Sequence, residues 1–196
     1  SMAAMTEQII AMSIKSLEEQ NTKLARETVE FDAKINEAER EVERICLNLL
    51  LQQQPVFAED LRRVSAALKM ITDMERIGEQ AEDIAEIAAT AKKKMLKKSK
   101  HIQRMAAATI DMVNKSVEAF IKKDLLVTEE VSHNDDVVDA LFEEIVNDLV
   151  DIIKKDEGTS EVLDMLMVAK YFERIGDHAV NIAEWVQFSI TGEHKR

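Results

Sequence analysis

The chain has 196 residues, of which 46% are hydrophobic and 33% are charged, with only 4 glycines and 1 proline. Sandwiches, barrels and α/β folds need a turn about every 8–12 residues, so this composition excludes them and predicts an all-α protein built from long amphipathic helices. The net charge of −12 argues against nucleic acid as a partner, because phosphate backbones would repel the chain. It favours cations and basic protein surfaces.

The single cysteine and the apolar segments indicate in which cellular compartment the protein is expected. Cys46 lies in the apolar run Ile45-Cys46-Leu47, and a lone cysteine cannot form an internal disulfide. We therefore predict a buried thiol in a reducing compartment. No apolar run approaches the roughly 18 residues of a membrane span, and no basic segment precedes an apolar one as in a signal peptide. These features predict a cytoplasmic protein.

Three helices are predicted in the first half, over about 5–20, about 22–53 and from Pro55 to about 94. Glu59 and Asp60 suit the early turns of the third helix, where the helix dipole favours negative charge. The second helix carries apolar residues at alternating spacings of four and three, which is typical of a helix in a bundle. They are Phe31, Ile35, Ala38, Val42, Ile45 and Leu49.

A lysine-rich joint over 92–100 leads to three more predicted helices, over about 100–122, 125–155 and 159–190. The joint is typical of a solvated helix end, with contact to anionic lipid or an acidic partner as the alternative. Gly158 and Gly192 are expected to end the last two helices. The apolar face of the fifth helix is formed by Val138, Leu141, Ile145, Leu149 and Ile152.

An internal repeat divides the chain. The segment ERIGEQAEDIAE, residues 75–86, recurs 98 residues later as ERIGDHAVNIAE, residues 173–184. Because each copy lies in the third helix of its half, the sequence predicts two tandem three-helix bundles, over 5–96 and 97–191. Gly78 and Gly176 hold equivalent positions inside these helices, where glycine costs about 1 kcal/mol relative to alanine. Either a neighbouring helix packs there or another group approaches the backbone.

Acidic residues follow the helical spacing in both copies. Glu75, Glu79 and Asp83 stand four residues apart, and their equivalents are Glu173, Asp177 and Asn181. Like charges at this spacing repel by a few tenths of a kcal/mol. A solvated face tolerates that repulsion, whereas a hard metal ion bound between the carboxylates would reverse it. Both interpretations remain open from the residues alone.

The preceding helix of each half supplies partners for these carboxylates. Asp135 and Asp139 are four residues apart in the second half, and Asp32 and Asn36 hold the corresponding places in the first. In an antiparallel hairpin around Gly158, Asp139 and Glu173 fall at similar heights. We therefore predict that Asp135 and Asp139 face Glu173 and Asp177.

A di-iron carboxylate bundle is the competing metal hypothesis. It needs a Glu-x-x-His motif on two helices, whereas only Glu130 and His133 have that spacing, and surface placement is the simpler interpretation. His178, beside Asp177, is a further candidate ligand, although its equivalent in the first copy is Gln80. No zinc-protease motif, glycine-rich phosphate loop or nucleophile–base pair is present.

Four segments together resemble the PhoU family, the bacterial regulators of phosphate uptake. They are Gln53-Gln54-Pro55, Asp60-Leu61-Arg62, Glu75-Arg76-Ile77-Gly78 and Glu173-Arg174-Ile175-Gly176-Asp177. The resemblance extends from about Glu7 to Ile190. It implies two tandem three-helix bundles, homodimers and no catalysis. It also implies two partners, the sensor histidine kinase of the phosphate response and the ATPase subunit of the phosphate ABC transporter.

The resemblance further implies metal binding through one carboxylate set per bundle, with Fe, Zn, Mn or Mg as the ion. The second set is Glu173, Asp177, Asp135 and Asp139, and the first is Glu75, Glu79, Asp32 and Asn36. The first set departs from the family pattern, because Glu79 stands where Asp is usual and Asn36 is neutral. Weaker binding is therefore expected there.

Three functional hypotheses follow. The first is a non-enzymatic cytoplasmic adaptor between kinase and transporter, in which metal tunes the bundles. The second is a carboxylate-metal oxidase or iron store, which the scarcity of histidine disfavours. The third is a structural, dimerising bundle without metal.

Overall fold

The structure, a computed structural model, describes the chain except residues 53–56, 92–99, 156–158 and 194–196. Its described residues form six α-helices and no β-strand, which confirms the predicted fold class. Pro55, Gly158, most of the lysine-rich joint and the predicted boundary between residues 96 and 97 lie outside the described residues. The helices are α1 (Met2–Glu19), α2 (Thr22–Gln52), α3 (Ala58–Thr90), α4 (Lys100–Lys122), α5 (Leu125–Lys154) and α6 (Thr159–Thr191).

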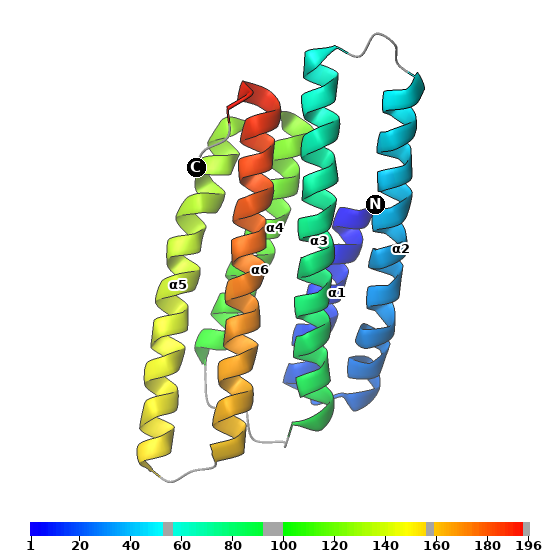
Figure 1. Ribbon diagram of the computed structural model, residues 1–196. Coiled ribbons are helices and arrows are strands. Elements are labelled where there is room, and N and C mark those ends of the chain that lie inside the picture. The colour runs from blue at the N-terminus through cyan, green and yellow to red at the C-terminus, as the bar shows by residue number, and fades with distance from the viewer. Residues whose placement is uncertain (53–56, 92–99, 156–158, 194–196) are drawn as a thin grey trace.

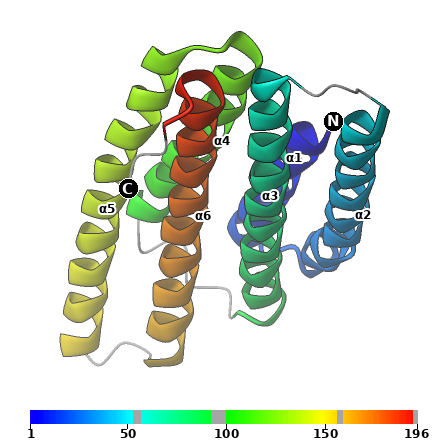
Figure 2. The same ribbon diagram turned by 45° about the horizontal axis from the view of Figure 1, so that its top comes forward.

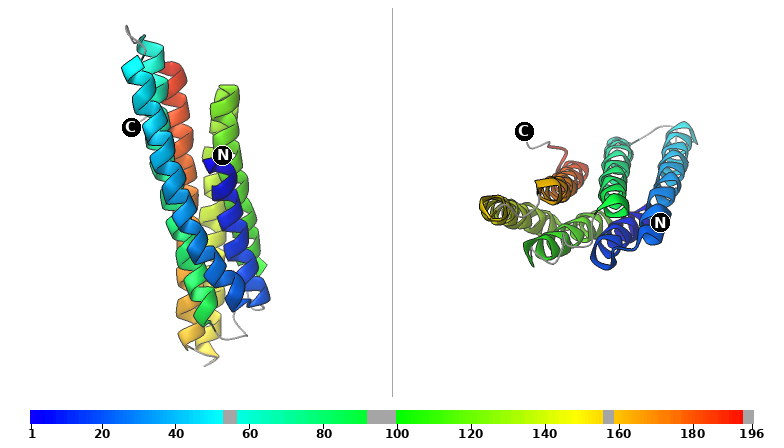
Figure 3. Two further views of the ribbon diagram at one scale, coloured as in Figure 1. Left: turned by 90° about the vertical axis from the view of Figure 1, so that its right-hand side faces the viewer. Right: turned by 90° about the horizontal axis from the view of Figure 1, so that it is seen from below.

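The helices form two three-helix units that lie side by side (Figure 1). In the first unit α1 and α2 pack on α3, and in the second α4 and α5 pack on α6. The long helices α3 and α6 run antiparallel and contact each other in the middle of the molecule (Figure 2). The outer helices α2 and α5 therefore lie at opposite edges (Figure 3).

The turns repeat as well as the helices. Gln20 ends α1 and Lys123 ends α4, both in the left-handed conformation with φ of 52° and 55°. The next residues, Asn21 and Asp124, each donate their N–H to a carbonyl five residues earlier, at 3.1 Å in both turns. Their side chains then accept a backbone N–H of the following helix, at 3.0 and 2.9 Å, as N-cap residues do. The duplication thus extends beyond the segment in which the sequence repeat is visible.

The predicted apolar face of α5 is buried, but that of α2 is buried only in part. Ile35 is fully buried, whereas Ile45 and Leu49 are 46% and 45% exposed. The reason is length, since α2 has 31 residues and α1 has 18. The last turns of α2 extend beyond α1 (Figure 1), and there Cys46 and Leu49 line a pocket together with Phe120 of α4.

Three smaller predictions can also be compared with the structure. Cys46 is buried, as expected, and burial raises the pKa of its thiol. Gly192 follows the end of α6 with φ of 79° and bonds back to the carbonyl of Phe188 at 2.8 Å. Within the described helices, none combines the length and apolar character needed to cross a membrane.

Candidate metal centres

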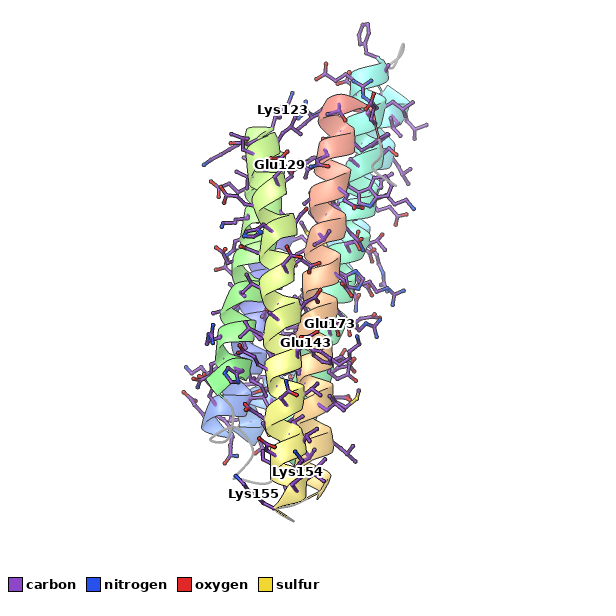
Figure 4. All side chains as sticks on the ribbon, turned by 90° about the vertical axis from the view of Figure 1, so that its left-hand side faces the viewer. Lys123, Glu129, Glu143, Lys154, Lys155 and Glu173 are labelled. Carbon is purple, nitrogen blue, oxygen red and sulfur yellow. The ribbon has the colours of Figure 1, made fainter. Side chains whose placement is uncertain are left out.

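The second-half pocket, defined by Asp135, Asp139, Glu173 and Asp177, lies between α5 and α6. Asp135 reaches from α5 to the backbone of α6 at Gly176. A Cβ atom built on Gly176 would lie 3.4 Å from Asp135 Oδ1. The carboxylate of Asp135 is therefore the group that approaches the backbone at Gly176, at the distance of an ordinary van der Waals contact. Figure 4 labels Glu173 on α6, as seen from the α5 side.

These four carboxylates interact electrostatically, as the sequence predicted. Burial raises the pKa of Asp135 to about 6, and the negative charges of Asp139, Asp177 and Glu173 contribute to the rise. Burial and then the charge of Glu173 also raise the pKa of Asp177. Asp135 and Asp177 therefore resist ionisation beside their acidic neighbours, which is the situation that a bound cation relieves.

The first-half pocket, defined by Asp32, Asn36, Glu75 and Glu79, is tighter. Asp32 on α2 is only 6% exposed. Its Oδ1 would lie 2.9 Å from a Cβ built on Gly78. Asn36 Nδ2 donates to Asp32 Oδ2 at 2.7 Å, but Oδ1 has no hydrogen-bond partner. A buried carboxylate oxygen without a partner is costly and calls for an explanation.

Burial is the main reason that the pKa values of Asp32 and Glu75 in the first-half pocket are raised. It raises the pKa of Asp32, against the effect of Asn36 and with a smaller contribution from Glu79. The pKa of Glu75 is raised by burial and then by the charges of Glu79, Glu39 and Asp32. The predicted residues are therefore brought together in this half too, with Asn36 as a donor to Asp32.

Glu82 belongs to the same cluster, although the sequence analysis did not select it. Burial raises its pKa to about 7, and the charge of Asp32 is the next cause. The signal that could have identified it is its position, four residues after Gly78 and therefore on the same side of α3. Val180 holds the equivalent place in the second half.

Asp83 and Asn181 form their hydrogen bonds outside the pockets, although the charge of Glu79 still contributes to the raised pKa of Asp83. Eight residues turn an α-helix by about 80° beyond two full turns, which carries both side chains towards the contact between α3 and α6. There Asp83 accepts a hydrogen bond from the Tyr171 hydroxyl. Asn181 Nδ2 donates to Asp73 at 3.2 Å.

The other candidate ligands also lie elsewhere. His178 is directed to α3, with its Nδ1 2.9 Å from Asp73 Oδ1, and so joins the two halves. Glu130 pairs with Lys115 at 3.1 Å. The side chain of His133 is 81% exposed. The Glu-x-x-His spacing is therefore a surface feature, as the simpler interpretation had it.

No three His, Cys, Asp or Glu side chains in the described parts of the chain converge closely enough to hold a metal ion as they stand. Basic side chains next to the pockets form ion pairs with some of these carboxylates, which is one reason that the carboxylates do not converge. Arg76 donates to Glu79 at 2.6 Å and lies 3.7 Å from Glu75, and Lys170 forms an ion pair with Glu173. Such partly exposed pairs contribute about 0–1 kcal/mol, so they would not prevent a cation from attracting the glutamates.

The residues fit a hard cation in their chemistry. Each pocket combines an aspartate seated on a glycine with glutamates or aspartates on the facing helix, and Asp32 offers a buried oxygen without a partner. Carboxylate oxygens suit Mg²⁺, Mn²⁺ and Ca²⁺. Without a cation, the same pockets hold negative charges in a partly buried place.

Comparisons with known proteins agree with the duplicated fold. The PhoU domain model matches residues 1–88 and again 102–186. The PhoU homologue of Clostridium acetobutylicum, named a phosphate-specific transport system accessory protein, is 34% identical over 98% of this chain and 89% of its own length. The accessory protein PhoU of Escherichia coli is 30% identical over 100% of this chain and 81% of its own.

Solved structures have the same architecture. The crystal structure of PhoU from Pseudomonas aeruginosa superposes with a TM-score of 0.90 at 28% identity, covering 98% of this chain and 93% of that one. The PhoU structure from Streptococcus pneumoniae gives a TM-score of 0.92 at 20% identity, covering 100% and 92%. With both halves matched by the family model and the whole chain matched by relatives, this chain belongs to the PhoU family.

Proposed function

We propose that this chain is a non-catalytic regulator of phosphate uptake whose two carboxylate pockets bind metal cations. Membership of a family of phosphate-transport accessory proteins supports the regulatory role. The observation that carries the metal binding is Asp32, whose buried Oδ1 lacks a partner and lies over the glycine of the facing helix. Its counterpart Asp135 also faces the glycine of the opposite helix, Gly176, but at a longer distance.

In each pocket the cation would supply positive charge between two helices that otherwise repel each other. Asp135 and Asp139 would hold it from α5, and Glu173 and Asp177 from α6. The corresponding groups of the first half are Asp32, Asn36, Glu75 and Glu79. Neutralising these groups would join α2 to α3 and α5 to α6, and so stiffen each bundle. All-oxygen donors favour Mg²⁺ or Mn²⁺, with Fe and Zn as the other ions to test.

Elemental analysis tests the metal binding directly. Protein purified without chelators and without an affinity metal is expected to contain metal in stoichiometric amount. Addition of Mn²⁺ to the metal-free protein is expected to raise the melting temperature, because an ion that binds only the folded state stabilises it. Absence of both effects would favour the structural, metal-free bundle.

The partners form the second part of the proposal. We propose a cytoplasmic homodimer whose helical faces dock on a sensor histidine kinase and on the ATPase subunit of a phosphate ABC transporter, so that membrane association occurs only through these partners. The test is a pull-down with each partner's cytoplasmic region, with and without phosphate and Mn²⁺. Recovery of neither partner under any condition would contradict the adaptor role.

The carboxylate-metal oxidase is not proposed. The three described histidines are engaged outside the pockets, with His101 beside Asp148, His133 near Asp136 and His178 on Asp73. Oxygen-dependent turnover by the purified protein, lost in Glu173→Ala, would reverse this assignment.

A further inference from the structure

The two halves differ in charge at two positions near their glycines. One difference removes a carboxylate from the first half, and the other adds one. On the outer helix, Asn36 of the first half stands where the second half has Asp139. On the central helix, Glu82 of the first half stands where the second half has Val180. At these two positions the first half therefore lacks one carboxylate on α2 and gains one on α3; Asp83, which stands where α6 has Asn181, instead contacts Tyr171.

We propose that Glu82 is a ligand of the first-half pocket and replaces the carboxylate that Asn36 lacks. This inference rests on the metal binding proposed above and adds a ligand that appears in neither predicted set. Each half then offers four carboxylates around its glycine. In the first half they are Asp32, Glu75, Glu79 and Glu82, and in the second Asp135, Asp139, Glu173 and Asp177.

The position of Asp32 supports the assignment. Its Oδ1 lies against Gly78, and Glu82, four places after Gly78, is on the same side of α3 one turn further along, close enough for the two carboxylates to interact electrostatically. Asp32 is buried and its Oδ1 has no hydrogen-bond partner. The unpartnered oxygen therefore lies where Glu82 and Glu79 can share a cation with it.

Asn36 contributes in a different way. Its amide donates to Asp32 Oδ2 at 2.7 Å, which leaves Oδ1 as the oxygen directed to α3. A carboxylate at this position would instead compete with Asp32 for positive charge. In this half Asn36 thus orients a ligand, as groups behind metal ligands commonly do.

Glu39 is the other acidic residue near the first-half pocket, and it fits the role less well. The charge of Asp32 contributes to the raised pKa of Glu82, whereas Glu39 contributes to the pKa values of Glu75 and Arg76. Glu39 belongs to α2, one turn beyond Asn36. Glu39→Gln therefore serves as the matched control for the loss of one negative charge.

The experiment titrates Mn²⁺ into protein freed of metal with EDTA and reads each half separately by methyl NMR. Ile35 Cδ1 would lie 3.1 Å from a Cβ on Gly78, and Val138 Cγ1 3.6 Å from one on Gly176, so paramagnetic broadening of these methyls reports the two pockets. In Glu82→Val, broadening of Ile35 is expected to need on the order of tenfold more Mn²⁺. Broadening of Val138 is expected to stay unchanged.

The swapped variants complete the test. Asn36→Asp added to Glu82→Val recreates the second-half pattern and is expected to restore broadening of Ile35. Asp139→Asn is expected to weaken only the Val138 response, and Asp139→Asn with Val180→Glu to restore it. Glu39→Gln is expected to shift the Ile35 response less than Glu82→Val does.

Unchanged broadening of Ile35 in Glu82→Val, or a larger effect of Glu39→Gln, would overturn the assignment of Glu82 while metal binding stands. Broadening of Val138 alone in the wild-type protein would show that the first half holds no cation, and would also overturn it. If neither methyl broadens in the wild-type protein, the proposed metal function fails together with this inference. Melting curves of each metal-free variant establish that it is folded.

Discussion

Asp32 fills the space that a side chain at Gly78 would need, with its Oδ1 2.9 Å from the position of a Cβ. The equivalent distance in the other half, from Asp135 Oδ1 to a Cβ on Gly176, is 3.4 Å. The first contact leaves no room for a methyl group unless Asp32 moves, whereas the second is an ordinary van der Waals contact. Two glycines at matched positions therefore differ in how strictly they are required.

This difference predicts opposite effects of the same substitution. Gly176→Ala is expected to stabilise the protein by up to about 1 kcal/mol, because alanine is the better helix former. In Gly78→Ala the crowding of Asp32 and Ile35 is expected to offset that gain, which leaves this variant roughly 1–2 kcal/mol less stable than Gly176→Ala. Urea unfolding of both variants measures the difference. Equal stabilities would contradict the crowding of Asp32.

The raised pKa of Glu82 predicts how stability depends on pH in metal-free protein. Its folded-state pKa of about 7 exceeds the ordinary glutamate value of 4.5, because of burial and of the charges of Asp32, Glu86, Asp83 and Glu79. The folded state therefore binds the proton more tightly. Its stabilising contribution is fully present below pH 4.5 and is lost as the pH rises through about 7.

We therefore expect the melting temperature in EDTA to fall between pH 5 and pH 8. Glu82 is expected to contribute on the order of 2 kcal/mol to this change after allowance for solvent screening. Asp135, with its pKa raised from 3.8 to about 6, adds a decrease between pH 4 and 6. Glu82→Val is expected to remove most of the decrease near pH 7, whereas Glu86→Gln, which removes only one of the charges that raise the pKa of Glu82, is expected to retain a smaller decrease.

Neutralising Asp32, the buried aspartate that faces Gly78, is expected to have different effects with and without metal. Asp32→Asn keeps a side-chain oxygen that can accept from Asn36 but removes a charge that burial disfavours. The metal-free variant is expected to melt a few degrees higher than wild type, and to gain less from added Mn²⁺. Differential scanning calorimetry with EDTA and with Mn²⁺ provides both numbers. A variant that gains as much from Mn²⁺ as wild type would remove Asp32 from the site.

The contact between the two halves depends on Asp73. Its Oδ1 lies 2.9 Å from His178 Nδ1 and accepts from Asn181 at 3.2 Å, in a mostly buried place. Asp73→Ala leaves these two polar groups without their partner, so we expect a loss of about 1–3 kcal/mol of unfolding free energy.

Asp83→Ala is the matched control for that substitution, because Asp83 contacts Tyr171 on the other side of the same helix pair. Burial raises the pKa of Asp83, so removal of its charge compensates for the lost hydrogen bond. We expect this variant to lose less than about 1 kcal/mol. Chemical denaturation compares the unfolding free energies of Asp73→Ala and Asp83→Ala. A larger loss in Asp83→Ala would show that Asp83 and Tyr171 contribute more to the contact between the halves than Asp73, His178 and Asn181 do.

The sequence by itself determined the helices, the duplication and most of each pocket. Helical periodicity and the scarcity of turn formers are local properties of the chain, and a repeated segment with glycines at matched positions predicts equal packing in both halves. Asp139 could be placed opposite Glu173 because an antiparallel hairpin fixes the height of facing residues, and the repeat extends the assignment to Asp32 and Asn36 of the first half. Equal spacing in the chain was enough for these assignments.

The tertiary structure decided which acidic residues face which neighbour. Asp83 and Asn181 match the spacing of the pocket residues, yet the accumulated rotation of the helix carries them to the contact between α3 and α6. Glu82 breaks the repeat and still lies beside Asp32, because its place is set by the helix that packs on Gly78. Rotation about a helix axis and the proximity of a second helix are properties of packing, so spacing along the chain could not determine them.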